Sequence, residues 1–332
     1  MSIKRLCTAI VAAASVALLT APQFARGEEK VLRTVCAFPK TNPLCQSFIR
    51  FVDKANKAGK GLFRINYIGG PEITKPREQP NAMRNGLFEM MYGPGPYYLG
   101  LLPEIDFIHY TNPEEARASG VFGMVRDVMK QKMDARFMGW FDSGLGLYLY
   151  TVKAPKRTAS GGIDLTGMKM RSSPAYRDFI KRLGGTPVVM ATGEVYTALE
   201  RGTIDGMGIG LTEVLDHRLE RFIKYRIEPP MTYTGLFMIM NQKVYDGLPK
   251  KTQDLLDKLS VEWEKESRQY WKIAQDQQKE KLAAAGLKTV ALPDAAAAEF
   301  VRTFRKDPMT RMEKNKNVKI DLEKLKKLVR YE

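Results

Sequence analysis

The sequence predicts an α/β protein of about two domains, and three observations lead to this prediction. Strand and helix patterns alternate through the first two thirds of the chain, an order typical of mainly parallel sheets with helices on their faces. The length of 332 residues corresponds to about two domains. A charged helical pattern over residues 250–285 is long enough, at about 1.5 Å per residue, to run across both domains.

Apolar periodicity and turn residues place the individual elements. In the first half we expect strands over 31–38, 63–68 and 145–152, and helices over 43–58, 79–85 and 113–140. The second half is predicted to hold strands over 168–171, 187–190 and 203–207, and helices over 174–183 and 193–200. Helices over 250–285 and 294–306 and a basic tail complete the chain. The polar stretch over 153–162 is the first candidate for a crossing between domains.

Two segments of the chain resemble each other. The stretch "EQPNAMRNGLFEM" from Glu78 aligns with "EVYTALERGTIDGM" from Glu194 at a constant offset of 116. Each is typical of a short helix that ends at a glycine and is followed by a strand, and the glycines are Gly86 and Gly202. The alignment indicates one unit shared by both domains, although helix, glycine and strand is a common order that chance also produces.

The N-terminal residues are typical of a secretory signal peptide. Lys4 and Arg5 precede an apolar run over 6–19, which is too short to span a bilayer, and small residues at Ala25 and Gly27 suit a cleavage site. Cys7 lies near the front of the run rather than at its end, where a lipid-attachment cysteine would stand. We therefore expect residues 1–27 to be a signal peptide cut before Glu28, and an exported protein with no direct membrane insertion.

The net charge is strongly basic. Removal of residues 1–27 takes away three basic residues and no acidic one, which lowers the net charge from +16 to +13. The Lys and Arg residues are spread along the chain, and their densest clusters lie on a late helix and in the tail. This distribution favours a solvated basic surface over a nucleic-acid partner.

Two cysteines remain after the predicted cleavage. Cys36 and Cys45 form an even pair, which in an oxidising compartment indicates a disulfide between the end of the first strand and the next helix. A metal site or a catalytic pair is the alternative, but the two histidines, His109 and His217, are remote in sequence from both cysteines. We expect a disulfide, no metal and no cofactor.

An arginine stands between a predicted strand and helix-start residues in "GMKMRSSPAY", residues 167–176. Ligands collect beyond the carboxyl ends of parallel strands, and a guanidinium there can hold both oxygens of a carboxylate. Ser172, Ser173 and Pro174 suit a helix N-terminus, which also favours an anion. The alternative is that Arg171 shares a strand face with Lys169 and points to water.

The surrounding segment "DLTGMKMRSSPAYRDFIKRLGGTPVVMATGEVYTALERGTIDGM", residues 164–207, closely resembles the signature of a known family. This family comprises the solute-binding subunits of tripartite ATP-independent periplasmic (TRAP) transporters, the C4-dicarboxylate-binding periplasmic proteins. The resemblance implies a two-lobed periplasmic binding protein fold in which the lobes close on a ligand, Arg171 clamps its carboxylate, and a membrane permease receives it. Lobe 1 would hold residues 28–151 and about 234–276, and lobe 2 residues 152–233 and about 277–332.

Three departures from the family pattern bear on the ligand. Thr192 and Gly193 stand where many family members have a bulky aromatic residue before Glu-Val-Tyr. The stretch "DGMGIG" over 205–210 stands where they have the more polar D-G-Q-E-N, and the strand over 148–152 lacks the second arginine that many of them carry. We therefore expect a monocarboxylate with an apolar body rather than a sugar acid. The expected ligand-binding residues are Arg171, Tyr176, Tyr92, Tyr97, Gln79, Thr192, Met207 and Phe237, of which the tyrosines, Met207 and Phe237 are also ordinary packing residues.

These features predict a periplasmic receptor for a small organic acid. A ligand-sensing module presented to a different receptor remains an alternative, because it would use the same hinge closure. An enzyme is disfavoured, because a chain with two histidines shows no recognisable spacing of a nucleophile and a base.

Overall fold

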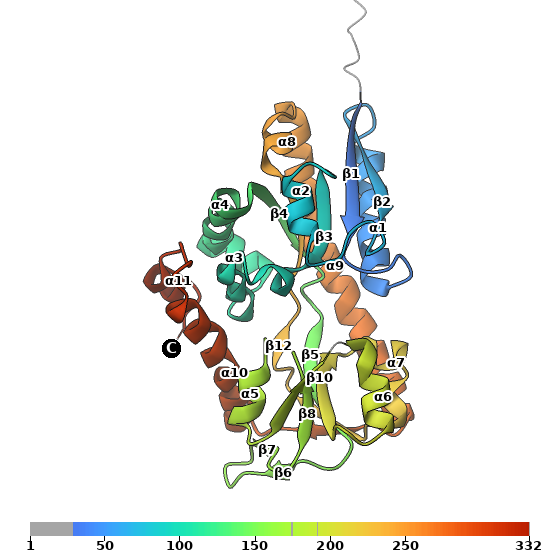
Figure 1. The fold of residues 1–332 in the computed structure, drawn as a ribbon, viewed down its shortest axis with the longest axis vertical. Coiled ribbons are helices and arrows are strands. Elements are labelled where there is room, and N and C mark those ends of the chain that lie inside the picture. Colours follow the sequence, from blue (N-terminus) through green and yellow to red (C-terminus); the bar gives the residue numbers. More distant parts are fainter. Residues whose placement is uncertain (1–28, 174, 191, 332) are drawn as a thin grey trace, which may run out of the picture.

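The chain folds into two α/β lobes stacked along the long axis of the molecule (Figure 1). The structure is a computed structural model that describes residues 29–173, 175–190 and 192–331. The predicted signal peptide and its cleavage site lie outside the described residues.

Lobe 1 is built on a five-stranded sheet in the order β2-β1-β3-β13-β4. Its strands are β1 (Lys30–Cys36), β2 (Phe63–Gly69), β3 (Met90–Pro94), β4 (Ala135–Phe141) and β13 (Leu236–Asn241). The first three are parallel, and β13 runs antiparallel to both of its neighbours. The helices are α1 (Pro43–Ala58), α2 (Gln79–Arg84), α3 (Pro113–Ser119), α4 (Val121–Met133) and α8 (Gln242–Asp246), with 3-10 turns η1 (Gly95–Tyr98) and η2 (Pro103–His109).

Local chemistry explains where α1 begins. The side chain of Asn42 accepts a hydrogen bond from the N–H of Leu44 at 2.9 Å, and Pro43 occupies the first helical position, where no N–H is needed. Phe48 and Phe51 recur on one face of the helix and are fully buried against the sheet. The predicted helix over 43–58 is confirmed.

The helix predicted over 113–140 is only partly confirmed. It is divided into α3 and α4, and its last residues form the strand β4 instead. Five consecutive residues from Phe137 to Phe141 are buried or nearly so, because helices cover both faces of the sheet here. A short run that is apolar throughout has no period, so the sequence pattern cannot distinguish a buried strand from a buried helix.

Lobe 2 contains a seven-stranded sheet in the order β14-β11-β5-β10-β8-β9, with β12 also paired to β5. Its strands are β5 (Gly146–Thr151), β8 (Lys169–Ser172), β9 (Thr186–Val189), β10 (Gly206–Gly210), β11 (Tyr225–Glu228), β12 (Thr232–Tyr233) and β14 (Lys288–Ala291). The helices are α5 (Arg177–Arg182), α6 (Val195–Glu200) and α7 (Glu213–Asp216), with 3-10 turns η3 (Thr192–Glu194) and η4 (Leu219–Arg221). Strands β8, β9 and β10 are parallel, and β5 is antiparallel to β10.

The chain crosses between the lobes earlier than predicted. The polar stretch over 153–162 is not a crossing, because it leads through the small hairpin of β6 (Lys156–Arg157) and β7 (Ile163–Asp164) within lobe 2. The crossing lies between β4 and β5, where Asp142 adopts a positive φ of 52°. A Cβ at Gly144 would lie 2.8 Å from the carbonyl oxygen of Arg268, so only glycine fits this close approach. The return crossing lies between β12 and β13.

The long helix α9 (Lys250–Ala284) is confirmed and connects both lobes. Leu256 and Trp263 pack in the lobe 1 core, and Leu282 packs in the lobe 2 core. Although α9 is long, none of the helices among the described residues is apolar enough over its length to cross a bilayer.

The C-terminal helices differ from the predicted division of the lobes. Helix α10 (Asp294–Lys314) starts in the lobe 2 core with Phe300 and Phe304, and then buries Met309 and Met312 in the lobe 1 core. Helix α11 (Leu322–Leu328) packs Leu325 against lobe 1 as well. Figure 1 shows this segment rising along one side from the lower lobe to the upper lobe. Residues from about Met309 therefore belong to lobe 1, because their apolar side chains complete its core.

The two similar segments form the same unit in both lobes. Helices α2 and α6, and strands β3 and β10, match residue for residue at the offset of 116. The carboxylates at equivalent positions play the same part: Glu89 accepts the N–H of Arg33 at 2.6 Å, and Asp205 accepts the N–H of Lys169 at 2.9 Å. Each of these bonds joins the unit to the neighbouring parallel strand. The predicted internal repeat is thus confirmed.

Cys36 ends β1, and Cys45 lies in the first turns of α1. Both side chains are fully buried in the same core and are free thiols, so the structure does not confirm the predicted disulfide. Burial raises the pKa of the Cys36 thiol, and the neighbouring Cys45 thiol raises it further. The two thiols are therefore neighbours, and the bridge stays a prediction.

We expect the exported protein to contain no free thiol when it is denatured without reductant. A disulfide across a loop of this length stabilises by roughly 2–3 kcal/mol in the chain-entropy model. Titration with a thiol reagent before and after reduction measures the bridge directly. Two reactive thiols in the unreduced, denatured protein would contradict it.

Candidate ligand-binding site

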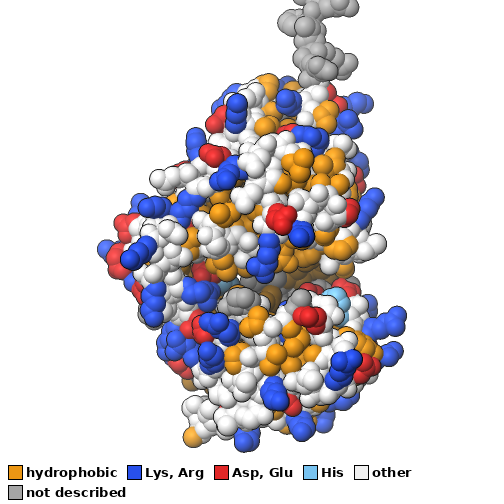
Figure 2. Space-filling model, in the orientation of Figure 1, with side chains coloured by type: hydrophobic (Ala, Val, Ile, Leu, Met, Phe, Trp, Pro, Cys, Tyr) orange, Lys and Arg blue, Asp and Glu red, His pale blue; other side chains and the backbone are white. Residues whose placement is uncertain are grey.

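The candidate site lies at the edge where the parallel strands of lobe 2 end. Arg171 of β8 is in register with Met207 of β10 and Val188 of β9, so the carboxyl ends of the three strands meet at one edge. The segments that follow them carry Tyr176, Thr192 and Glu213. Figure 2 shows that the molecular surface is hollowed between the two lobes.

Arg171 is a buried side chain held by four hydrogen bonds. Its Nη1 donates to the Tyr176 hydroxyl at 2.7 Å and to the Gly208 carbonyl at 2.8 Å. Its Nη2 donates to Thr192 Oγ1 at 3.1 Å, and its Nε donates to the Met190 carbonyl at 3.3 Å. Arg171 is 7% exposed. The alternative that it points to water is therefore wrong.

These bonds determine what the guanidinium can offer to a ligand. An arginine has five N–H donors, so the four bonds of Arg171 leave one N–H, on Nη2, without a partner among the described residues. Thr192 accepts from that same nitrogen, which leaves its own O–H to donate. An arriving carboxylate can thus take one oxygen to Nη2 and the other to the Thr192 hydroxyl, without breaking the bonds that orient Arg171.

The helix expected at this place differs from the prediction. Helix α5 begins at Arg177 with Tyr176 as its N-cap, and it is only six residues long. Pro174 lies outside the described residues. The helix thus begins too late and is too short to provide the predicted anion site at Arg171, because the effect of the helix dipole is confined to the first turn.

Tyr176 closes the inner wall of the site. It is 4% exposed and donates its hydroxyl to the Gly208 carbonyl at 2.6 Å. Burial raises the pKa of Tyr176 to about 12, so the phenol is neutral at physiological pH. A Cβ at Gly208 would lie 2.7 Å from the Tyr176 ring, which explains the need for glycine in this strand.

Lobe 1 contributes Tyr97 and Arg77. The Arg77 guanidinium carbon lies 5.4 Å from the centroid of the Tyr97 ring, within the range of a cation–π contact. Burial raises the pKa of Tyr97, the positive charges of Arg77 and Arg171 lower it, and the negative charge of Glu213 raises it. The charges that act on the Tyr97 hydroxyl therefore come from both lobes. Arg77 supplies a cation that sequence reasoning did not anticipate.

Glu213 is the second residue that sequence reasoning missed. Its Oε2 accepts the N–H of Gly210 at 3.0 Å, and the side chain is partly buried. Burial raises the pKa of Glu213, whereas the Gly210 N–H and the charge of Arg171 lower it. The offset of 116 could have indicated this residue, since it matches Glu213 with Tyr97.

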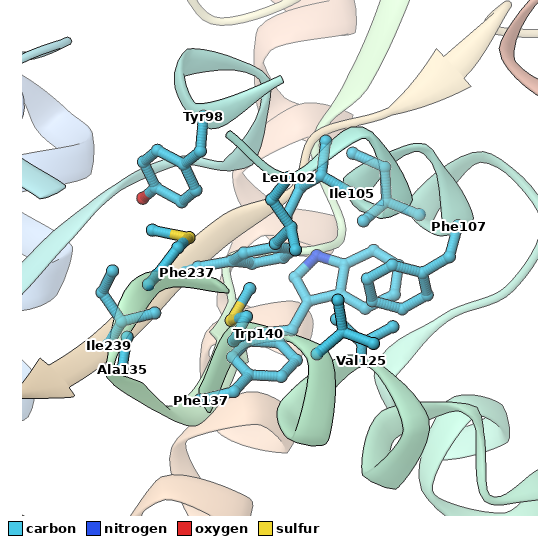
Figure 3. Close-up of a cluster of buried hydrophobic side chains, with 14 of the residues drawn as sticks. Tyr98, Leu102, Ile105, Phe107, Val125, Ala135, Phe137, Trp140, Phe237 and Ile239 are labelled. Carbon is cyan, nitrogen blue, oxygen red and sulfur yellow. The ribbon is translucent and has the colours of Figure 1, made fainter. Parts of the chain in front are cut away.

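Four of the expected ligand-binding residues do not lie with Arg171 and Thr192 at the candidate site. Tyr92 is fully buried and donates to Asp142, and Gln79 is fully buried and donates to the Cys36 carbonyl at 3.2 Å. Met207 packs in the lobe 2 core. Phe237 lies among the aromatic rings of the lobe 1 core (Figure 3).

A second groove lies between the lobes, along α9, with a volume of about 1040 Å³. Its lining includes Arg268 and Lys272 of α9, Asn112 of lobe 1 and Arg305 of α10, but none of Arg171, Tyr97 or Glu213. No three His, Cys, Asp or Glu side chains in the described part of the chain are placed to hold a metal ion.

Comparison with known proteins is consistent with this geometry. The model of the bacterial extracellular solute-binding proteins of family 7 matches residues 36–315, which is most of the chain. The chain belongs to this family. Its members are the solute-binding subunits of TRAP transporters, which are receptors rather than enzymes.

Three relatives in the family illustrate the likeness. The C4-dicarboxylate-binding periplasmic protein of Rhodobacter capsulatus is 24% identical over 79% of this chain and 80% of its own length. A Bordetella pertussis solute receptor that binds pyroglutamic acid has a TM-score of 0.72 at 18% identity, covering 91% of this chain and 99% of its own. A Bordetella bronchiseptica TRAP solute-binding protein, with copurified calcium and picolinate in its site, has a TM-score of 0.74 at 21% identity, covering 91% and 92%. These similarities confirm the predicted two-lobed fold.

Proposed function

We propose that this protein captures a small organic acid between its two lobes and delivers it to a TRAP-type membrane permease. The observation that carries the proposal is the buried guanidinium of Arg171, which keeps a donor beside the Thr192 hydroxyl at the ends of the lobe 2 strands. A carboxylate that loses its water on lobe closure needs charged and hydrogen-bonding partners of this kind.

The relatives support the class of ligand. A C4-dicarboxylate, pyroglutamic acid and picolinate are the ligands given for three of them, and each of these molecules carries a carboxylate. The binding of different acids by one fold suits a site in which the anion is held by shared residues and the rest of the pocket varies. We expect this protein to be located in the periplasm, after cleavage of its signal peptide before Glu28.

We expect a small acid to copurify with the exported protein and to be identified by mass spectrometry of the denatured sample. Added back to the stripped protein, it should raise the unfolding free energy by about 2.7 kcal/mol at a hundredfold excess over Kd, because it binds only the folded state. Thermal shift measures the stabilisation, and chromatography shows whether the acid returns unchanged. Conversion into a product would contradict a receptor role.

Delivery is tested separately from capture. In proteoliposomes that contain the TRAP permease encoded with this protein, uptake of the labelled acid should require the solute-binding protein. Acid uptake at the same rate without it, or a binding protein that captures acid but never supports uptake, would contradict delivery and favour a sensing role.

A further inference from the structure

Glu213 occupies a special position in the internal repeat. Strand β3 ends at Pro94 and strand β10 ends at Gly210, and these two residues are equivalent at the offset of 116. Tyr97 and Glu213 each lie three residues further on, and are therefore equivalent too. Both positions follow a strand whose carboxyl end faces the other lobe.

Arg171 and Glu213 are anchored to the same strand, because Nη1 of Arg171 donates to the Gly208 carbonyl at 2.8 Å and Oε2 of Glu213 accepts the N–H of Gly210 at 3.0 Å, two residues further along β10. The Tyr97 hydroxyl senses the charge of Glu213 as well as that of Arg171, although the three residues come from separate segments of the chain. The charges of a carboxylate and a guanidinium from lobe 2 thus both act on a tyrosine from lobe 1. The Arg171 and Glu213 side chains make no direct ion pair with each other among the described residues.

The strand β10 is adapted to hold Glu213 in this place. A Cβ at Gly210 would lie 2.8 Å from Oε2 of Glu213, so any larger residue there would displace the carboxylate. The Gly210 N–H occupies Oε2 alone. The other oxygen, Oε1, accepts no hydrogen bond from the described residues. It does not belong to the fully buried polar atoms that lack a partner, so it is accessible from outside. It is therefore free to accept a bond from a ligand.

From this juxtaposition we propose that Glu213 determines specificity, by selecting acids that also carry a protonated amine. The inference rests on the proposed function, because Arg171 and Thr192 would hold the carboxylate. Glu213 would then accept from the ammonium group through Oε1. Ligand and site would neutralise each other, whereas a dicarboxylate would bring a second negative charge next to a partly buried carboxylate.

The test uses matched triads of acids in three sizes, which differ only in one substituent next to the carboxylate. The triads are alanine, propionate and methylmalonate; leucine, 4-methylpentanoate and isobutylmalonate; and phenylalanine, 3-phenylpropionate and benzylmalonate. In at least one triad, calorimetric titration of the unaltered protein should show the amine bound at least about tenfold more tightly than its two partners.

The variant Glu213→Gln keeps the size of the side chain and an oxygen that can accept the Gly210 N–H. We expect its affinity for the amine-bearing acid to fall at least about tenfold, and its affinity for the plain acid to stay within about twofold. The malonate should bind the variant more tightly than it binds the unaltered protein. Glu200→Gln, at an exposed position on α6, is the matched control and should change none of these affinities.

The melting temperature of the unliganded variant separates a ligand-binding role from a structural one. Burial disfavours the charge of Glu213, so Glu213→Gln should not lower the melting temperature. A residue that merely stabilised the loop after β10 would lower it. Glu213→Asp is a second variant, since it keeps the charge but draws it back by one methylene, and we expect intermediate affinity for the amine.

The outcomes distinguish this inference from the proposed function. If plain acids or malonates bind through Arg171 while Glu213→Gln changes no preference, the inference about Glu213 is overturned and the acid-binding function stands. If no amine is preferred in any triad, the inference is likewise overturned. If no acid copurifies and none binds, the proposed function fails together with it.

Discussion

Replacement of Arg171 by alanine should weaken binding of the native acid by about 2–5 kcal/mol, or roughly 30-fold to several thousandfold. The reason is that the carboxylate would remain buried between the lobes without its cation. The guanidinium also orients the Tyr176 hydroxyl and Thr192, so its loss disturbs the remaining donors as well. Calorimetric titration of the variant with the copurified acid measures the effect.

The variant Arg171→Lys should fail almost as badly. An ammonium group is a point charge and cannot bond Gly208, Tyr176 and Thr192 while presenting a further N–H to the ligand. Lys169→Ala, at the exposed first residue of β8, is the control and should leave affinity unchanged. Melting temperatures of all variants separate loss of the fold from loss of the site. Near-native affinity in both Arg171 variants would rule out the carboxylate contact.

Replacement of Phe237 by alanine should destabilise the protein by about 3–5 kcal/mol and leave the affinity of the folded fraction unchanged. Phe237 is 0% exposed, and its ring centroid lies 4.7 Å from that of Phe137 and 6.1 Å from that of Trp140. Figure 3 shows Phe237 surrounded by these rings and by the aliphatic side chains of lobe 1. Truncation would leave a cavity that these packed neighbours cannot fill.

Urea unfolding followed by tryptophan fluorescence measures this loss, because Trp140 is a direct neighbour. Phe237→Leu should cost much less, about 1 kcal/mol, since it keeps most of the apolar volume. Leu87→Ala, at a position that is 51% exposed, should stay within about 0.5 kcal/mol. If Phe237→Ala left stability intact and abolished ligand binding instead, Phe237 would be a cleft residue after all.

Patterns that depend on neighbouring residues predicted the fold well. The α1 helix follows from Asn42, Pro43 and one apolar face, and the internal repeat follows from a glycine that ends each short helix. Both signals are local, because capping and a positive φ involve a few consecutive residues. The place of Arg171 at the end of a predicted strand favoured a ligand-binding role, but Lys169 on the same strand face made a side chain in water an equal alternative. Only the tertiary structure decided between the two.

The sequence by itself determined the α/β class, the two lobes, the long α9, the repeated unit and the importance of Arg171. Only the tertiary structure decided which side chains join Arg171. Arg77, Tyr97 and Glu213 come from segments far apart in the chain, and their approach depends on how the two lobes are stacked. It also placed Phe237 and Met207 in cores, since an apolar residue beside a cleft and one behind it look alike in sequence. The path of α10 was undecided for the same reason: Met309 and Met312 bury their side chains against a partner that lies nearby in space and far away in the chain.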